Sequence, residues 1–514
     1  MQKESMSRIR QKTKKVKQSG GRVLFRLIFG RTMITVLLLL LQILCLIGIF
    51  RMVGLSENLL TISNLLGMAA IIYIINSEEN PAFKLAWVLP ICLVPVFGIG
   101  FYLFIILNPG NRGLQKLLNR RKDETKPYLR TEYRVVEKLK KESSGIRNLG
   151  HYIQNQNGFP TCDHTNVTFF ATGEEKYADL LKELERAEQF IFLEYFIINQ
   201  GEVWDHVLEI LERKAKAGVE VRVMYDGMCA LVSLPYRYPQ QLRERGIKAK
   251  MFSPIKPLLS THQNNRDHRK IAVIDGRVAY NGGINLADEY MNIKKRFGHW
   301  KDTAVKLEGE AVRSFTVMFL QMWSVCAFRP EYDFDYGPFL DTGDHFHSPA
   351  LNMDGYSIPF SDSPLDGEPV GHQVYLDILY QARRYVYIMT PYLILDDDMV
   401  TALTYAAKRG VDTVIVMPHI PDKKYAFMLA HSYYPELMEA GVKIYEYLPG
   451  FIHSKTFVSD DEKAVVGSIN MDFRSQYLNF ECAVYIYKNP VIGDIRADFD
   501  ETLKKCVRMS MESY

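Results

Sequence analysis

Two short segments of this chain, "DHRKIAVIDG" and "IHSKTFVSDD", share the pattern H-x-K-x4-D. The residues of the pattern are His268, Lys270, Asp275, His453, Lys455 and Asp460. One copy on an apolar strand would be weak evidence for a function. Two copies in register are hard to reach by chance, so we expect them to act together.

The residue types in this pattern suit chemistry on a phosphate diester. Residues two positions apart on a strand point to the same face, so each His projects beside its Lys. If the two halves face each other, two imidazoles and two ammonium groups meet at one site, which would attract and polarise a phosphate. A neutral imidazole can attack phosphorus to form a covalent phosphoryl-enzyme, and the second imidazole can protonate the departing alcohol. The same groups serve hydrolysis or transfer.

Further polar residues accompany each copy. Seven positions after each motif Asp the chain reads "GGIN" or "GSIN", ending in Asn285 and Asn470, whose amides could bind phosphate oxygens. Asp275 and Asp460 adjoin turn sequences ("DG" and "DD"), so capping a turn is as reasonable as a chemical role. The predicted catalytic set therefore contains both aspartates, with this alternative open.

Two carboxylates, Glu194 and Glu481, lie in apolar strand-like segments. Each could orient an imidazole or simply be a buried acid. The segment "GHWKD", with Trp300, Lys301 and Asp302, is interpreted as packing and surface.

The elements around the motifs repeat as well. "FIFLEYFII" (190–198) predicts a buried strand, "VWDHVLEILERKAKAG" a helix ending at Gly218, and "VEVRVMYD" the next strand. The same order returns in "YVYIMTPYLIL", "MVTALTYAAKRG" and "VDTVIVMP". This duplication, with a period near 185 residues between the two motif histidines, predicts two tandem α/β sandwich domains related by a pseudo-twofold axis.

The N-terminal region differs from this body. Ten Lys or Arg precede Thr32, against the single acid Glu4, and three apolar segments follow at about 33–53, 57–76 and 85–107. Segments of this kind predict a membrane anchor flanked by basic residues. The predicted division is therefore 1–130 for the basic and transmembrane region, 131–345 for the first domain and 346–514 for the second. Basic residues on both sides of the anchor favour a cytoplasmic catalytic body, although three crossings would place the flanks on opposite sides.

The seven cysteines are scattered, with no CxxC or Cys/His ligand spacing. A zinc site is therefore not expected, and free thiols mildly favour a reducing compartment.

At the paired motifs the chain resembles the phospholipase D superfamily, over nearly everything after about Gly150. Within it, the sequence is similar to the membrane-bound bacterial cardiolipin synthases. The segments that carry this likeness are "NPAFKLAWVLPICLVPVFGIGFYLF", "GHWKDTAVKLEGEAV", "TPYLILDD", "YEYLPGFIHSKT" and "VGSINMDFRSQYLNFE". The apolar segment 33–50 is additional to the usual hydrophobic pair.

The resemblance implies a reversible phosphatidyl transfer between two phosphatidylglycerol molecules, giving cardiolipin and glycerol through a phosphohistidine, without metal or nucleotide. His268 would be the nucleophile and His453 the acid/base, while Lys270, Lys455, Asn285 and Asn470 would hold phosphate oxygens. The expected partners are phosphatidylglycerol and cardiolipin in a bacterial cell membrane, and no nucleic acid. A membrane-bound hydrolase and a non-catalytic lipid-binding scaffold are the alternatives; the intact motifs argue against the scaffold.

Overall fold

The fold is known from a computed structural model. It describes residues 57–77, 80–93, 95–106, 109–229, 233–235, 237–254, 264–326, 334–340 and 354–512. The chain divides into two compact units, one of residues 1–109 with 255–263 and the other of 110–254 with 264–514. The predicted apolar segment 33–53 lies outside the described residues.

The first unit contains three apolar helices, α3 (Glu57–Ile75), α4 (Pro81–Leu93) and α5 (Pro95–Ile106). They share a small core around Ile74, Ile91 and Tyr102. The apolar segment 85–107 is thus divided between two helices, because Pro95 lacks the N–H that would continue α4. In the part of the chain that the structure describes, no helix is both long and apolar enough to cross a membrane.

The second unit contains two large sheets. The first sheet runs in the order β1 (Thr165–Phe170), β9 (Ala304–Gly309), β7 (Val278–Gly282), β6 (Lys270–Ile274), β2 (Phe190–Tyr195), β3 (Glu220–Asp226) and β4 (Lys248–Phe252). Strands β2, β3 and β4 run parallel to one another, and every other pair of neighbouring strands in this sheet is antiparallel.

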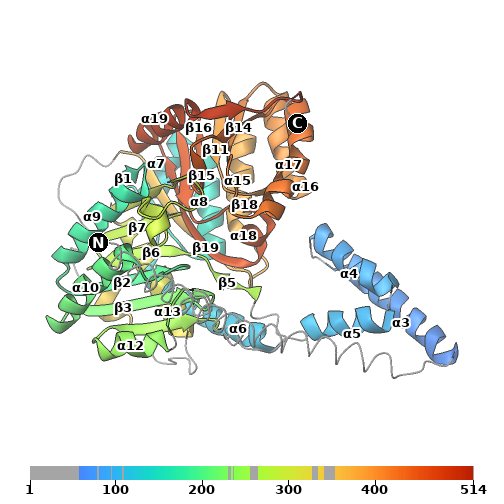
Figure 1. Cartoon of the computed structure of the whole chain (residues 1–514), viewed down its shortest axis with the longest axis horizontal. Coiled ribbons are helices and arrows are strands. Elements are labelled where there is room, and N and C mark those ends of the chain that lie inside the picture. Colours follow the sequence, from blue (N-terminus) through green and yellow to red (C-terminus); the bar gives the residue numbers. More distant parts are fainter. Residues whose placement is uncertain are drawn as a thin grey trace, which may run out of the picture. The chain divides into compact units, whose positions relative to one another are not determined.

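The second sheet repeats this order strand for strand. It runs β10 (Tyr356–Asp362), β19 (Asn479–Tyr487), β17 (Lys463–Gly467), β16 (Thr456–Ser459), β11 (Tyr385–Met389), β13 (Asp412–Pro418), β14 (Lys443–Tyr447) and then β20 (Cys506–Arg508). The internal duplication read from the sequence is therefore present in the topology, as the green-to-yellow and orange-to-red sheets of Figure 1 show.

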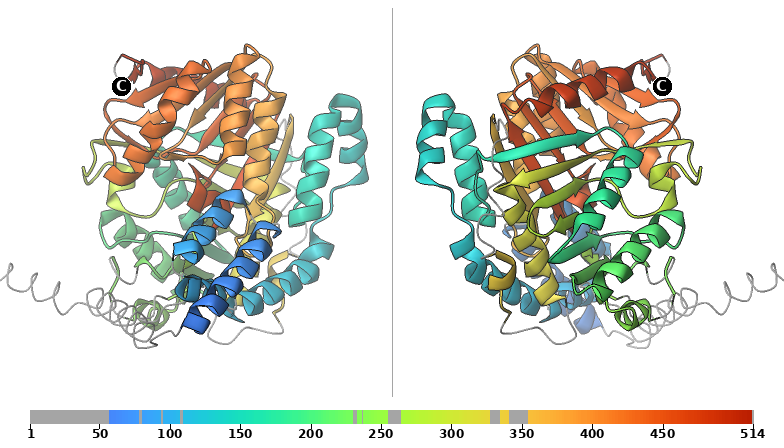
Figure 2. Two further views of the ribbon diagram at one scale, coloured as in Figure 1. Left: turned by 90° about the vertical axis from the view of Figure 1, so that its right-hand side faces the viewer. Right: turned by 90° about the vertical axis from the view of Figure 1, so that its left-hand side faces the viewer.

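Helices cover the outer faces of both sheets (Figure 2). In the first half these are α9 (Gly173–Arg186), α10 (Glu202–Lys216) and α12 (Tyr238–Glu244), with the short η3 (Asp288–Met291); in the second they are α15 (Val370–Gln381), α16 (Asp397–Lys408), α17 (Lys424–Glu439), α18 (Phe473–Tyr477) and α19 (Val491–Leu503). The segment before β1 forms α6 (Pro109–Thr125), η1 (Lys126–Tyr128), α7 (Tyr133–Glu142) and α8 (Ser144–Asn157), and α14 (Gly337–Leu340) follows the first half.

Helices α7 and α8 pack in the core of the second sheet, although they precede the first sheet in the chain. Their buried residues Leu139 and Ile146 share a cluster with Ile358 of β10 and Tyr375 of α15. The predicted first domain, 131–345, thus begins with two helices that contact the other half. Its predicted end at 345 lies outside the described residues, so this division stays a prediction.

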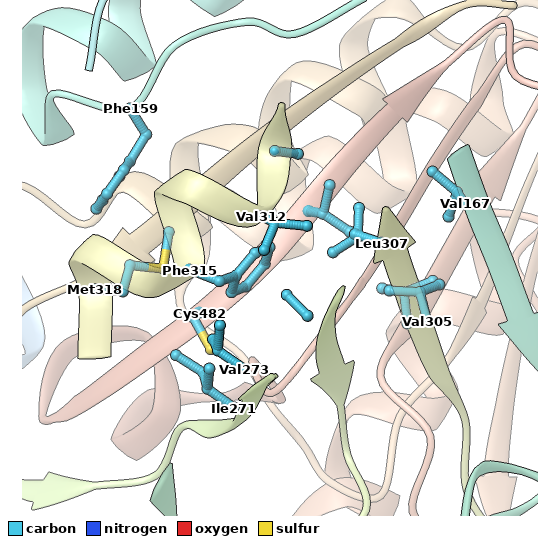
Figure 3. Close-up of a cluster of buried hydrophobic side chains, with 14 of the residues drawn as sticks. Phe159, Val167, Ile271, Val273, Val305, Leu307, Val312, Phe315, Met318 and Cys482 are labelled. Atoms are coloured by element: carbon cyan, nitrogen blue, oxygen red, sulfur yellow. The ribbon is translucent and has the colours of Figure 1, made fainter. Parts of the chain in front are cut away.

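A continuous apolar core joins the two halves. Helix α13 (Ala311–Val325) lies within it, and every residue from Phe315 to Val325 is buried. Figure 3 shows Phe315 of α13 near Ile271 of β6 and Cys482 of β19, which belong to different halves. Burying this apolar surface stabilises one fixed arrangement of the two sheets, which is what a site shared between them requires.

Three short strand pairs lie outside these two orders. β5 (Arg266–Asp267) pairs with β19, β8 (His299–Lys301) pairs with β15 (Gly450–Ile452), and β12 (Leu393–Ile394) pairs with β18 (Met471–Asp472). The first two pairs join the two halves. Strand β5 immediately precedes His268, and β15, which pairs with β8, immediately precedes His453.

Candidate active site

His268 is held by the second half of the chain. It lies between β5 and β6, and its backbone N–H donates to the carbonyl of Phe480 at 2.9 Å. Its ring Nδ1 lies 2.8 and 2.9 Å from the two carboxylate oxygens of Glu481. A carboxylate accepts hydrogen bonds, so we assign the ring proton to Nδ1, which leaves the lone pair of Nε2 available for chemistry.

His453 is held in the same way by the first half. Its backbone N–H donates to the carbonyl of Lys301 at 2.7 Å, and its Nδ1 lies 2.6 Å from Oδ2 of Asp302. In both halves, therefore, the residue whose carbonyl accepts from the histidine backbone N–H immediately precedes the carboxylate that lies beside the ring Nδ1. The two halves thus exchange equivalent contacts.

The two histidines and two lysines lie within electrostatic reach of one another. Burial, followed by the positive charges of Lys455, Lys270 and His268, lowers the pKa of His453 well below its usual value. Burial also lowers the pKa of His268 to about 4, with Lys270 and Lys455 contributing in the same direction and Glu481 opposing them. Groups from both copies of the motif thus affect each other, which brings the two predicted halves of the site together.

The lysine side chains are buried beside their histidines. Lys270 Nζ donates to the backbone carbonyl of His268, and Lys455 Nζ donates to that of His453. Because burial removes both amino groups from water, the pKa of Lys270 is lowered to about 8 and that of Lys455 to about 7. An anion beside them would replace that missing solvation, which is a property expected of a phosphate site.

Each carboxylate is fixed by its own half. Glu481 accepts hydrogen bonds from the hydroxyls of Ser468 and Ser475. His268 and Lys270 lower its pKa against the opposing effect of burial, so it is ionised at neutral pH. Asp302 accepts from the backbone N–H of Thr303 at 2.8 Å, and burial raises its pKa to about 6.

Gly283 occupies the position in the first half that Ser468 occupies in the second. A Cβ at Gly283 would lie 2.1 Å from Oδ1 of Asp302, so a larger residue and this carboxylate position exclude each other. The single difference between "GGIN" and "GSIN" thus follows from the two carboxylates. Asp302 occupies the space beside Gly283, whereas Glu481 accepts a hydrogen bond from the Ser468 hydroxyl.

The two asparagines are both buried but differ in their contacts. Asn285 accepts from the backbone N–H of Ile197 at 2.9 Å and donates to the hydroxyl of Tyr290 at 2.8 Å. The ring of Tyr290 in turn meets that of His453 edge to face, with 5.4 Å between centroids. The Oδ1 atom of Asn470 is buried without a hydrogen-bond partner. A phosphate oxygen accepts hydrogen bonds, so only the Nδ2 hydrogens of Asn285 and Asn470 could bind it.

Asp275 and Asp460 support the backbone. Asp275 accepts from the backbone N–H groups of Glu188, Gln189 and Phe190, at 2.8 Å each. Asp460 repeats this with three consecutive N–H groups at 2.8 to 3.1 Å, those of Arg383, Arg384 and Tyr385. Each aspartate thus fixes the start of the central strand, β2 or β11, beside its motif strand. These contacts favour the turn-supporting alternative over a chemical role.

Two interpretations made from the sequence require correction. Glu194 does not contact an imidazole; its carboxylate forms an ion pair with Arg269, at 2.5 Å. Conversely, Asp302 and Lys301 are buried rather than at the surface, and Asp302 contacts His453. Once Glu481 is considered as a partner for one motif histidine, the duplication itself calls for a counterpart in the first half. That signal could have singled out Asp302.

Among the residues that the structure describes, no group of three or more His, Cys, Asp or Glu side chains could hold a metal ion.

Comparison with known proteins agrees with the fold and motifs. Residues 180–323 and 375–503 match the family described as "Cardiolipin synthase, PLD-like domain", and residues 65–105 match "Phospholipase_D-nuclease N-terminal". A cardiolipin synthase of Geobacillus sp. is 35% identical over 451 residues, covering 86% of this chain and 87% of the relative. An uncharacterized protein of Streptococcus mutans is 52% identical over 443 residues, covering 86% and 94%.

The crystal structure of phosphatidylserine synthase from Haemophilus influenzae aligns with a TM-score of 0.52 at 13% identity, covering 67% of this chain and 87% of that one, which shows a shared fold. The duplicated topology, the paired motifs and the two matched regions together establish that the chain belongs to the cardiolipin synthase family of phospholipase D-like proteins.

Proposed function

We propose that this protein synthesises cardiolipin by transferring a phosphatidyl group between two phosphatidylglycerol molecules, with release of glycerol. In the first step a motif histidine forms a bond to phosphorus while the bond from phosphorus to the glycerol oxygen breaks. In the second step the free glycerol hydroxyl of another phosphatidylglycerol displaces the histidine. One phosphodiester is lost and one is gained, so the reaction is reversible.

His268 is the proposed nucleophile. Its Nδ1 proton is directed to Glu481, whose pKa is lowered, and burial keeps the imidazole neutral by lowering its pKa to about 4. A neutral ring with an ionised acceptor on Nδ1 has a more electron-rich Nε2, which favours attack on phosphorus.

His453 is the proposed acid and base. It must donate a proton to the departing glycerol and then take one from the incoming hydroxyl. Burial and Lys455 lower its pKa, but a phosphodiester bound beside it brings a negative charge that raises the pKa again. Asp302, at 2.6 Å from Nδ1, stabilises the charged ring during transfer and is a positioning residue, as is Glu481.

The phosphate oxygens are assigned to Lys270, Lys455, Asn285 and Asn470. The poorly solvated ammonium groups of the two lysines support this assignment, because charge developing on the transferring phosphoryl group would be stabilised most in such surroundings. Asp275 and Asp460 hold the backbone on which the motif strands rest.

The first unit is the proposed membrane anchor, together with the segment predicted at 33–53. Helices α3 to α5 expose many large apolar side chains, which are Ile62, Leu65, Leu66, Met68, Ile72, Tyr73, Ile75, Leu85, Leu89, Leu93, Phe101 and Leu103. Apolar surface of this extent is typical of contact with lipid. A multi-pass anchor with its basic flanks on the cytoplasmic side would place the catalytic body where phosphatidylglycerol is available.

The observation that carries the proposal is the reciprocal support of His268 and His453 by carboxylates from opposite halves. The test is mass spectrometry of lipids after incubating the purified full-length protein with phosphatidylglycerol in mixed micelles. Wild type is compared with His268→Ala and His453→Ala.

Cardiolipin and glycerol in equal amounts from wild type alone is the expected result. Phosphatidic acid without cardiolipin would mean that water is the acceptor, and the protein would then be a hydrolase. Equal turnover by wild type and both variants would remove the histidines from the mechanism.

A further inference from the structure

The exposed face of α17 changes character along its length. Residues on this face recur with helical spacing, and in the first two turns they are Tyr425, Met428 and Leu429, with exposed fractions of 66%, 73% and 49%. Further along, the same face carries Ser432, Glu436 and Glu439. A helix face that only meets water would be polar throughout, as the second half of this one is. The apolar part therefore requires its own explanation.

The charges on α17 run against the preference of an isolated helix. Lys423 and Lys424 are exposed at its beginning, while Glu436 and Glu439 lie near its end, with no acid in the first turn and no base in the last. The helix dipole favours acids at the beginning and bases at the end, so this order of charges is unfavourable for the helix. An external negatively charged surface would compensate that cost at the basic end only.

The basic, apolar end of α17 is close to the site. Lys423 Nζ lies over the ring of Tyr392, 4.8 Å from its centroid. Tyr392 contacts Phe451, whose ring is 5.8 Å from that of His453. Consistent with this short chain of contacts, the charge of Lys423 contributes to lowering the pKa of His453.

A second exposed segment adjoins this end. Ile420 is 38% exposed, and its backbone N–H donates to the carbonyl of Gly450. Gly450 in turn forms a β-bridge with Gly298. Gly298 ends a basic loop that carries Ile293, Lys294, Lys295 and Arg296, all exposed. The base of the loop is closed by Asn292 and Trp300, which exchange two hydrogen bonds of 2.7 and 3.0 Å.

We propose that these residues form a docking surface for an anionic lipid bilayer, which brings the headgroup layer to the His453 side of the site. The docking surface consists of Ile293, Lys294, Lys295, Arg296, Ile420, Lys423, Lys424, Tyr425, Met428 and Leu429. The apolar side chains enter the boundary between headgroups and acyl chains, and the lysines and Arg296 contact lipid phosphates. This inference rests on the proposed function, because the substrate is itself an anionic lipid.

Charge and residue composition favour a bilayer over a protein partner. The surface combines five cations with five apolar or aromatic side chains, which is the composition of helices that lie in an anionic membrane interface. Two carboxylates lie beside it. Asp422 accepts from the hydroxyl of Tyr392 through Oδ2, and Glu289 pairs with Arg296 and offsets part of its charge, which leaves the four lysines in excess.

The first test compares two forms of the same substrate with full-length protein in nanodiscs. Met428→Asp and Leu429→Asp should lower kcat/KM for phosphatidylglycerol of the surrounding bilayer by about tenfold, because each places a charge where lipid must pack. Turnover of monomeric dihexanoyl phosphatidylglycerol should stay within about twofold of wild type. Tyr405→Asp on α16 is the matched control, since Tyr405 is 52% exposed on another helix, and Met428→Leu should behave as wild type.

The second test is independent of turnover. A photoreactive phenylalanine derivative at position 428 should form lipid adducts in nanodiscs containing phosphatidylglycerol, whereas the same group at 405 should not. Equal lipid labelling at both positions, or adducts at 428 to a second copy or to another segment of this chain, would overturn the docking surface. If wild type acts on neither substrate form, the proposed function fails, and the labelling result still decides the docking proposal.

Discussion

Nδ1 of His268 lies 2.8 Å from Oε1 of Glu481, although the two residues are 213 positions apart in the chain. The reciprocal contact joins His453 to Asp302 across 151 positions. Because each half supplies the carboxylate for the other half's histidine, neither half contains a complete site. The duplication therefore works as a pair and not as two independent copies.

Removing the charge of either carboxylate should slow the reaction without unfolding the protein. Glu481→Gln replaces an acceptor by an amide that can donate to Nδ1, which would move the ring proton to Nε2 and block attack on phosphorus. We expect kcat to fall by about 10²- to 10⁴-fold with KM little changed, and Asp302→Asn to behave similarly. Cardiolipin formation under saturating phosphatidylglycerol measures the effect; a variant that changes KM alone would contradict the positioning role.

Substitution of Asp275 should affect stability more than chemistry. Asp275→Ala leaves three backbone N–H groups without an acceptor, for which we expect a loss of about 3 kcal/mol or more in the free energy of unfolding. Asp275 also has a positive φ of 54°, which Asn tolerates better than Ala. Asp275→Asn can retain the two bonds to Oδ1 and should lose much less.

Thermal unfolding in detergent, with turnover normalised to folded protein, separates these effects. The normalised kcat of Asp275→Asn should stay within a few-fold of wild type. A large loss of kcat in fully folded Asp275→Asn would show that this carboxylate takes part in the chemistry after all.

Gly283→Ala should displace the carboxylate of Asp302 specifically. Its Cβ would lie 2.1 Å from Oδ1 of Asp302, so the carboxylate must move away from His453. We expect kcat to fall by about 10-fold or more, in the manner of Asp302→Asn but less severely. Gly493→Ala on α19, where a Cβ would meet no atom within 4 Å, is the matched control and should keep full activity. Equal activities of the two variants would argue against the need for space at position 283.

The stability of the protein should depend on pH through His268. Burial lowers its pKa to about 4 in the folded protein, against the ordinary value of 6.5. Between these two pH values the unfolded chain binds the proton and the folded chain does not, so the free energy of unfolding rises as pH increases from about 4 to 6.5. His268→Asn removes this contribution, and the difference in thermal unfolding midpoint between pH 5 and pH 7 should shrink. An unchanged difference would mean that the ring titrates normally.

The sequence by itself determined the duplicated α/β body, because strand and helix periodicities are local properties and recur in the same order in both halves. It also determined the phosphate chemistry, since the residues of H-x-K-x4-D and its asparagine recur at the same spacing in both halves. The expectation that each His and Lys share a strand was wrong, because His268, His453 and Lys455 lie in the segments just before β6 and β16. What it could not determine was which acids serve the histidines. Glu194 and Glu481 look alike as single acids in apolar strands, and Asp302 looks like a surface residue after Trp300.

Only the tertiary structure separated these three acids. Glu194 meets Arg269 within its own half, whereas Glu481 and Asp302 meet the histidine of the opposite half. The shared core around α13 sets this pairing, because it fixes the two sheets in one arrangement and brings β5 against β19 and β8 against β15. Such contacts join residues far apart in the chain, and the local pattern around each acid carries no record of them.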